Sequence, residues 1–476
     1  MTGTYLFQTL SSGRLLWVVA ALTLAVVAGS KGLRGRSSEA HKRGVVLREP
    51  TPRQDRSAPW RRGNRPWQPV ARARKSNLIP LTLAGAAVPF LDETKHFKMI
   101  GTTGSGKSTA IAELLGTALA RGDRAVFADP DGGYCRRFFR RYRGDVILNP
   151  FDSQSVQWDP FAEIRDPYDV EQLAAGLIAG SEDSASNEWR GYARTFLATV
   201  LRRCWLERRP PGELWRLLAV ASIEELRAVV VDSPAQPFLD PENARMFGSI
   251  RSVTVSAVAA LEYLHKQRST PFSVRDWVRA TVPGALFIPY KAGQIAALRS
   301  MIATWMRLAL FEAMNGREDR DLRLWFVVDE LDALGAIDGL KDALARLRKF
   351  GGRCVLGFQS IAQVSGTYGV AEAQTLVENC GNTLILRCSG SENGGTSAFA
   401  SRLIGEREVV RRQTSRGSDR EGAFGTRGMR RSRNVSDQHV TETAVMASQI
   451  EQLADLCGYF KSASSPAWRQ VELSHG

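Results

Sequence analysis

Short apolar runs recur between residues 97 and 386 of this chain, and each run ends at a turn-forming or charged residue. Helical patterns separate many of these runs, and this alternation is typical of buried strands in a parallel sheet. We therefore predict the α/β fold class. The predicted strands are residues 97–100, 125–128, 146–148, 285–288, 324–328, 354–358 and 383–386.

Residues 182–270 follow a different pattern, without a convincing strand. Five apolar residues at nearly helical spacing predict a helix over residues 188–204, and we expect further helices over 223–231 and 250–264. A capping box at Ser222 opens the second of these helices. We interpret this region as an all-α domain inserted into the α/β domain. The five apolar residues are Trp189, Tyr192, Phe196, Val200 and Cys204.

Residues 15–30 are uncharged and strongly apolar. As a helix they would span roughly 24 Å, slightly less than a hydrocarbon core of about 30 Å. We predict a transmembrane anchor over residues 1–30, and a cleaved signal peptide is the alternative. The basic residues of the following segment, 31–76, which we interpret as a linker, favour a single-pass protein whose bulk lies in the cytoplasm.

The net charge of the chain is +15, from 64 Lys and Arg against 49 Asp and Glu. Such an excess favours nucleic acid or an anionic membrane surface as a partner, and the alternative is that the basic charge only sets membrane topology. Residues 411–436 are rich in Arg, Ser and Gly, and we predict a mobile loop there. Six cysteines without a C-x-x-C pair and five scattered histidines argue against a disulfide scaffold and a zinc site.

Residues 101–108 read Gly-Thr-Thr-Gly-Ser-Gly-Lys-Ser, a complete phosphate-binding loop. Its glycines let backbone N–H groups surround the phosphates, while Lys107 reaches the β- and γ-phosphates and Ser108 binds Mg²⁺. We therefore expect ATP and Mg²⁺ as cofactors. The predicted nucleotide-binding residues are Gly101, Thr102, Thr103, Gly104, Ser105, Gly106, Lys107, Ser108 and Thr109.

The apolar run 324–328 ends in two carboxylates, Asp329 and Glu330. Beside a phosphate-binding loop this is the second half of an ATPase site, in which Asp329 holds the Mg²⁺ shell and Glu330 polarises the attacking water. The long sequence separation from Lys107 fits an insertion between the two motifs.

Three further features are candidates for chemistry. Gln359 ends the run 354–358 and would sense the γ-phosphate, with an ordinary turn residue as the alternative. Arg348 lies off the apolar stripe of a helix predicted over 337–350, so it is either a solvated charge or a group that reaches a neighbouring subunit's nucleotide. Residues 129–133, Asp-Pro-Asp-Gly-Gly, would form a turn at the edge of the sheet where ligands bind in open α/β folds, with a plain turn that binds nothing as the alternative.

Together these segments resemble the coupling proteins of conjugation and type IV secretion, which are membrane-anchored hexameric DNA-translocating ATPases. The resemblance covers roughly residues 77–476 and includes Trp-Phe-Val-Val-Asp-Glu at 325 and Gly-Phe-Gln-Ser-Ile-Ala-Gln at 357. It implies that Arg348 is the family's arginine finger and that Gln359 is its motif-three glutamine. One departure is that family members usually carry two membrane helices, whereas a single apolar segment is credible here.

The resemblance implies a RecA-like P-loop NTPase motor domain (77–181 and 271–476), with the all-α domain (182–270) inserted into it. It also implies a homo-hexamer in the inner membrane that couples a relaxase and single-stranded DNA to a type IV secretion channel; double-stranded DNA is the alternative substrate. Two other functions stay open: a double-stranded DNA pump of the chromosome-segregation type, and a non-motor membrane adaptor with a vestigial nucleotide site.

Overall fold

The computed structural model describes residues 40–48, 79–180, 184–264, 266–267, 269–280, 282–316, 318, 322–392, 394–419 and 430–474. The described residues belong to two compact units, which we treat separately. The larger unit contains Val45–Gly405 and Ala444–Gly476, and the smaller one contains Ala40–Gly44 and Glu406–Thr443.

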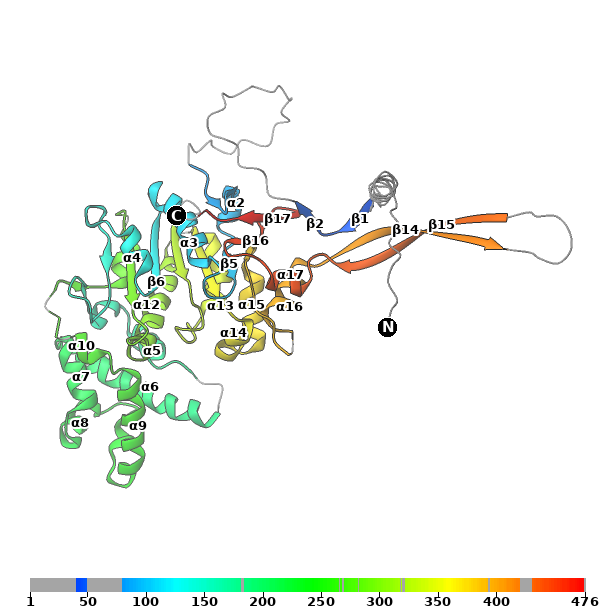
Figure 1. Cartoon of the computed structure of the whole chain (residues 1–476). Coiled ribbons are helices and arrows are strands. Elements are labelled where there is room, and N and C mark those ends of the chain that lie inside the picture. Colours follow the sequence, from blue (N-terminus) through cyan, green and yellow to red (C-terminus); the bar gives the residue numbers. More distant parts are fainter. Residues whose placement is uncertain are drawn as a thin grey trace, which may run out of the picture. The chain divides into compact units, whose positions relative to one another are not determined.

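A ten-stranded sheet forms the centre of the larger unit, in the order β2-β17-β16-β13-β5-β12-β11-β6-β10-β7. Figure 1 labels β2, β5, β6, β16 and β17 of this sheet. The seven strands from β13 to β7 run parallel, and β16 pairs antiparallel with both of its neighbours. The α/β fold class is therefore confirmed, and all seven predicted runs are strands of this sheet, some with ends shifted by one or two residues. The strands are β2 (Val46–Arg48), β5 (Phe97–Ile100), β6 (Arg124–Pro130), β7 (Val146–Ile147), β10 (Ala285–Tyr290), β11 (Leu324–Val328), β12 (Gly352–Phe358), β13 (Asn382–Ile385), β16 (Cys457–Lys461) and β17 (Ala467–Glu472).

Helices cover both faces of the parallel part of this sheet, which explains why its parallel strands, such as β6, β10 and β11, are almost continuously buried. On one face Phe127 and Val327 share a core with α3 (Lys107–Ala120). On the other face Val126 and Phe326 pack in a second core, which contains α12 (Ile295–Asn315). The remaining elements around the sheet are β3 (Thr82–Leu83), β4 (Ala86–Ala87), α2 (Phe90–Glu93), α4 (Gly133–Phe138), η1 (Arg141–Arg143), β8 (Gln157–Trp158), η2 (Pro160–Glu163), α5 (Pro167–Leu177), β9 (Pro271–Phe272), α11 (Val274–Arg279), α13 (Leu340–Leu347), η5 (Arg348–Phe350), α14 (Ile361–Tyr368), α15 (Val370–Asn379), α16 (Gly395–Ile404) and α17 (Ala447–Glu451).

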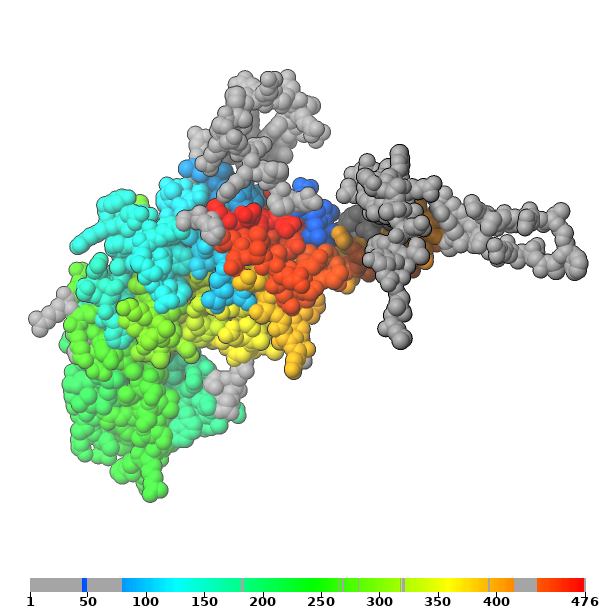
Figure 2. Space-filling model, viewed as in Figure 1, coloured from blue at the N-terminus to red at the C-terminus, as the bar shows by residue number. Residues whose placement is uncertain are grey.

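Every regular element in the described residues between 184 and 264 is a helix, and in Figure 2 these residues form a green lobe that adjoins the α/β part. Phe196, Val200 and Cys204 are fully buried in it, as expected for core residues. The Ser222 hydroxyl accepts a hydrogen bond from the Glu225 N–H, so the predicted N-cap is present. The helix predicted over 250–264 is instead two helices. The elements are α6 (Ser184–Leu206), α7 (Pro211–Ala219), α8 (Ile223–Val230), η3 (Gln236–Leu239), η4 (Pro241–Asn243), α9 (Ala244–Ala257) and α10 (Leu261–Leu264).

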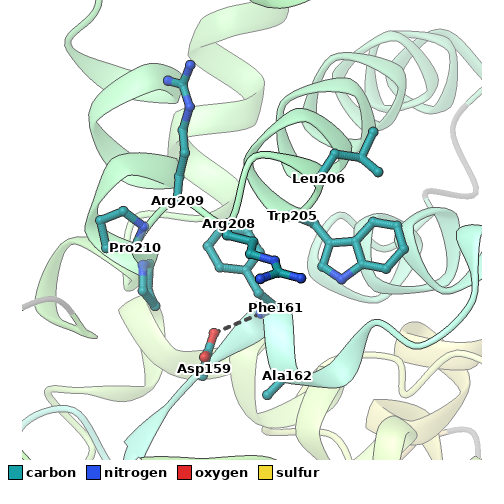
Figure 3. Close-up of a pocket in the computed structure, with 9 residues that line it drawn as sticks. Asp159, Phe161, Ala162, Trp205, Leu206, Arg208, Arg209 and Pro210 are labelled. Atoms are coloured by element: carbon teal, nitrogen blue, oxygen red, sulfur yellow. Dashed lines mark hydrogen bonds between the residues drawn. The ribbon is translucent and has the colours of Figure 1, made fainter.

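A pocket of about 650 Å³ lies where this helical lobe meets the α/β part (Figure 3). One wall comes from the turn after β8, in which the Asp159 carboxylate accepts a hydrogen bond from the Phe161 N–H at 2.9 Å. The opposite wall comes from the end of α6 and the start of α7. The lining residues are Asp159, Phe161, Ala162, Trp205, Leu206, Arg208, Arg209, Pro210 and Pro211, so this pocket is separate from the phosphate-binding loop.

The smaller unit is a three-stranded antiparallel sheet of β1 (Ala40–Gly44), β14 (Glu406–Asp419) and β15 (Arg430–Thr443). The prediction of a loop over 411–436 is therefore wrong for most of that segment. Continuous backbone pairing from Glu406↔Thr443 to Asp419↔Arg430 holds β14 and β15 together. The segment is polar and lacks the alternation of apolar residues from which a strand is predicted. An ion pair across the strands, Arg412–Asp437 at 3.0 Å, adds to this pairing.

Two predictions concern the N-terminal region. The interpretation of 31–76 as a linker fails at β1 and β2, which both pair with strands from the C-terminal part of the sequence. The predicted anchor over 1–30, with its apolar segment 15–30, lies outside the described residues. Within the described part of the chain, no helix combines the length and apolar character that a membrane span requires.

Candidate active site

The predicted site residues lie at one edge of the sheet, because parallel strands bring their carboxyl ends together. Ile100 at the end of β5 pairs with Phe358 at the end of β12. Val328 at the end of β11 pairs with both Leu356 and Ala128 of its two neighbours. The segments that follow these strands therefore converge on one pocket, although they are far apart in the sequence.

The phosphate-binding loop connects β5 to the N-terminus of α3, and its glycines are required by its conformation. Gly104 and Gly106 have φ of +77° and +113°, where other residues are strained. A Cβ atom on Gly106 would also lie 2.8 Å from Leu456 Cδ2. The C-terminal segment supports the loop directly, since the Leu456 N–H donates to the Ser105 carbonyl at 3.0 Å. The loop is thus held with the first turn of a 14-residue helix beside it, an arrangement suited to anions.

The Lys107 side chain folds back onto this loop. Its Nζ donates to the carbonyl oxygens of Gly101 at 2.6 Å and Thr102 at 3.1 Å. Burial lowers the pKa of Lys107, and the nearby carboxylates of Asp329 and Glu330 oppose that shift. The ammonium group therefore lies at the pocket with exchangeable partners, as a phosphate-binding lysine requires.

Ser108 and Asp329 meet although more than two hundred residues separate them. The Ser108 hydroxyl donates to Asp329 Oδ2 at 2.6 Å, and the Tyr134 hydroxyl donates to the same oxygen at 2.7 Å. Among the described residues, the buried Oδ1 of Asp329 has no hydrogen-bond partner. A hydroxyl and a carboxylate with one free oxygen fit Mg²⁺, which prefers oxygen ligands and keeps positions for water and phosphate. Ser108 and Asp329 are therefore the candidate Mg²⁺ site. In the described residues, no group of three His, Cys, Asp or Glu is arranged to hold a metal.

Tyr134 is a site residue that the sequence motifs do not reveal. It is 4% exposed and belongs to α4, directly after the turn at 129–133. The Asp129 carboxylate accepts the N–H groups of Tyr134 at 3.0 Å and Cys135 at 2.6 Å, which fixes the start of α4. Burial and the Asp329 charge raise the pKa of Tyr134 well above its usual range, so its hydroxyl remains a donor. The turn at 129–133 thus positions Tyr134 against Asp329.

Glu330, Gln359 and Thr103 form a second chain of contacts across the pocket. Gln359 Nε2 donates to Glu330 Oε1 at 3.2 Å, while Gln359 Oε1 accepts the Thr103 hydroxyl at 2.9 Å. Burial raises the pKa of Glu330, and the neighbouring Asp329 carboxylate adds to this shift. A raised pKa makes the carboxylate more basic, as a group that polarises water should be. Gln359 therefore bridges the phosphate-binding loop and this candidate base.

Nine of the thirteen predicted site residues line one pocket of about 400 Å³, and Gly101, Thr102 and Ser105 belong to the phosphate-binding loop without lining this pocket. Arg348 does not line it either: it is exposed at the start of η5, which precedes β12 and so lies at the opposite edge of the sheet from the pocket. Asp455 and Leu456 line the pocket without having been predicted, because they reach it from the C-terminal segment. The lining residues are Thr103, Gly104, Gly106, Lys107, Ser108, Thr109, Asp329, Glu330, Gln359, Asp455 and Leu456.

Comparisons with known proteins agree with this geometry. Residues 80–474 match the family described as type IV secretion-system coupling protein DNA-binding domain. The coupling protein TraD of Escherichia coli K12 is 32% identical over 382 residues, which cover 77% of this chain and 51% of TraD. This chain spans about half the length of the curated relatives that it matches.

Solved structures of the coupling protein TrwB share the fold. The unbound form of TrwBdeltaN70 has a TM-score of 0.73 and 31% sequence identity, over 84% of this chain and 90% of that chain. TrwB in complex with ADP and Mg²⁺ is similar to the same degree, with a TM-score of 0.73 and 31% identity over 84% of this chain and 89% of that one.

Proposed function

Because the chain belongs to the type IV secretion-system coupling proteins, we propose that it is an ATPase that drives DNA toward a type IV secretion channel during conjugative transfer. The observation that carries this proposal is the pocket in which Lys107, Ser108 and Asp329 meet at the carboxyl edge of the sheet. A relative that binds ADP and Mg²⁺ with the same fold supports ATP and Mg²⁺ as ligands here.

Each residue has a distinct part in the proposed reaction. Lys107 leaves the carbonyl groups of Gly101 and Thr102 and binds the β- and γ-phosphates. Ser108 and Asp329 hold Mg²⁺, which neutralises charge on the phosphate oxygens when it is bound. The remaining loop residues Gly101–Ser105, Gly106 and Thr109 surround the phosphates.

Glu330 and Gln359 activate the attacking water and control when it reacts. The raised pKa of Glu330 suits it to accept a proton from water. Gln359 is bonded to both Glu330 and Thr103, so a γ-phosphate that attracts Gln359 also frees Glu330. The pair would thereby restrict hydrolysis to a correctly seated nucleotide.

The finer organisation is also part of the proposal. Residues 77–181 and 271–476 form a RecA-like motor domain, and residues 182–270 form an inserted all-α domain that meets the substrate first. Residues 1–30 anchor the protein in the inner membrane as a single pass, and residues 31–39 connect this anchor to β1. In a homo-hexamer, Arg348 of one subunit contacts the nucleotide of the neighbouring subunit. This arrangement is compatible with the position of Arg348 away from the pocket of its own subunit. The partners are a relaxase with single-stranded DNA and the secretion channel.

Two variants test the chemistry. Lys107→Ala removes the phosphate contact and should abolish nucleotide binding and turnover. Glu330→Gln keeps the shape of the side chain but not its basicity, so it should bind ATP and fail to hydrolyse it. Binding of a fluorescent ATP analogue and release of phosphate separate the two effects. Parental turnover by Glu330→Gln would refute the role assigned to this carboxylate.

A further inference from the structure

The segment from α4 to η1 carries five arginines within residues 136–143. Four of these arginines are exposed, and the tyrosine among them is 90% exposed. No part of the proposed reaction uses these exposed side chains. We name them the α4–η1 patch; its members are Arg136, Arg137, Arg140, Arg141 and Tyr142.

Inward-facing aromatic side chains hold this segment on the sheet. The ring of Phe138 lies 6.4 Å from that of Phe127 on β6, and the ring of Phe139 lies 6.1 Å from that of Phe287 on β10. Arg143 is pinned as well, since it donates to the buried Asp145 carboxylate at 2.5 and 2.8 Å. The backbone beneath the patch is therefore fixed, and the patch residues face outward from a fixed base.

No arginine of the patch forms an ion pair with a carboxylate of the described residues, although Arg136 lies close enough to the buried Asp129 to lower its pKa. In the part of the chain that the structure describes, the one ion pair of this segment is Arg143–Asp145, outside the patch. Arg136 and Arg140 each donate one N–H to a backbone carbonyl, at 2.5 and 2.7 Å, which leaves most of their five donors unused. Four guanidinium groups this close in sequence repel one another, and an anionic polymer would relieve that repulsion.

We propose that the α4–η1 patch binds the phosphate backbone of single-stranded nucleic acid, with Tyr142 as a stacking surface for a base. This inference rests on the proposed function and assigns a specific surface to its substrate. Guanidinium forks match phosphate geometry, and exposed aromatic rings stack on bases without sequence preference. An acidic protein or an anionic membrane would satisfy the charges, but a nucleic-acid strand alone places planar bases beside a regular row of phosphates.

The position of the patch also connects it to the active site. Its first residues belong to α4, the helix whose inner side carries Tyr134. Tyr134 donates to Asp329, the candidate Mg²⁺ ligand, and Asp129 fixes the start of the same helix. A strand bound to the outer side of α4 therefore contacts the element that orients the Mg²⁺ carboxylate.

The test replaces Arg137, Arg140 and Arg141 together with glutamine in the full chain of 476 residues. A control variant replaces Arg245, Lys341 and Arg402, which are exposed elsewhere, and so removes the same charge. Binding of a labelled deoxythymidine oligonucleotide is followed by fluorescence anisotropy over a salt series. Log affinity falls with log salt, and the loss of three phosphate contacts should make this fall less steep by about 2 in slope. Binding near 0.1 M salt should weaken by about 10- to 100-fold.

A second variant, Tyr142→Ala, separates stacking from charge: we expect binding to weaken about fivefold or more with an unchanged salt slope. The control variant should keep the parental slope. Parental affinity and slope in the triple variant would overturn the proposal, as would equal losses in the triple variant and the control. The proposal would also be overturned if the triple variant lost binding to phosphatidylglycerol vesicles but kept binding to the oligonucleotide, because the patch would then belong to a membrane contact. Failure of the parent protein to bind the oligonucleotide at all would instead refute the proposed function.

Discussion

Substitution of Tyr134 by phenylalanine tests the architecture of the Mg²⁺ site with the loss of a single oxygen atom. The Tyr134 hydroxyl donates to Asp329 Oδ2 at 2.7 Å in a buried setting. A hydrogen bond to a charged acceptor contributes about 1.5–3 kcal/mol. Removal of a group that orients a metal ligand typically weakens metal affinity about 10- to 100-fold, which corresponds to a similar free energy. We therefore expect at least a tenfold weaker affinity for Mg²⁺ in the nucleotide-bound protein.

The assay titrates Mg²⁺ into the protein with a fluorescent ADP analogue, and Mn²⁺ with detection by electron paramagnetic resonance gives an independent readout. Tyr290→Phe is the matched control, because among the described residues the buried Tyr290 hydroxyl has no hydrogen-bond partner. It should leave the metal affinity unchanged. An unaltered Mg²⁺ affinity in Tyr134→Phe would refute the positioning role, as would an equal loss in both variants.

Three further predictions concern the subunit interface, pH and the anchor. Arg348→Ala should bind ATP but hydrolyse it about 10³-fold more slowly or worse, and mixing it with Lys107→Ala should partly restore turnover, since some interfaces then combine an intact finger with an intact loop; parental turnover by Arg348→Ala alone would refute this. The pKa of Glu330 is raised, so Glu330 should become protonated at a pH above the usual glutamate pKa of about 4.3. Protonation removes the base, and kcat/KM should therefore fall on acidification in this range. If the residual activity of Glu330→Gln falls over the same pH range, the titration belongs to another group. Deleting residues 1–39, which leaves β1 and β2 in place, should lower the fraction of hexamers in mass photometry because the membrane no longer concentrates subunits; complete hexamers at sub-micromolar concentration would contradict the role of the anchor.

The sequence predicted those parts of the fold that depend on local pattern. The strand 324–328 is apolar throughout because helices cover both faces of the sheet, so the run itself marks the strand. The loop 101–108 is recognisable because close backbone approach to phosphate demands glycine at defined positions, and Gly106 at φ +113° meets that demand.

Features that arise from long-range contacts were not predictable in this way. Tyr134 reaches Asp329 only because β6 and β11 are neighbours in the sheet, and no spacing along the chain records that contact. The β14–β15 pair was missed because backbone hydrogen bonds between two polar segments hold it together. Arg348 is the opposite case: its spacing in the sequence matches a family motif, but in the structure it lies at the other edge of the sheet from the nucleotide pocket of the same chain.

The central claim, ATP-driven movement along DNA, is tested most directly by displacement of streptavidin from oligonucleotides biotinylated at either end. The parent protein should displace streptavidin from one of the two ends in the presence of ATP, and neither a non-hydrolysable analogue nor the Glu330→Gln variant should support displacement. Displacement from neither end, by protein that binds the oligonucleotide and hydrolyses ATP, would contradict the assignment as a DNA-translocating motor.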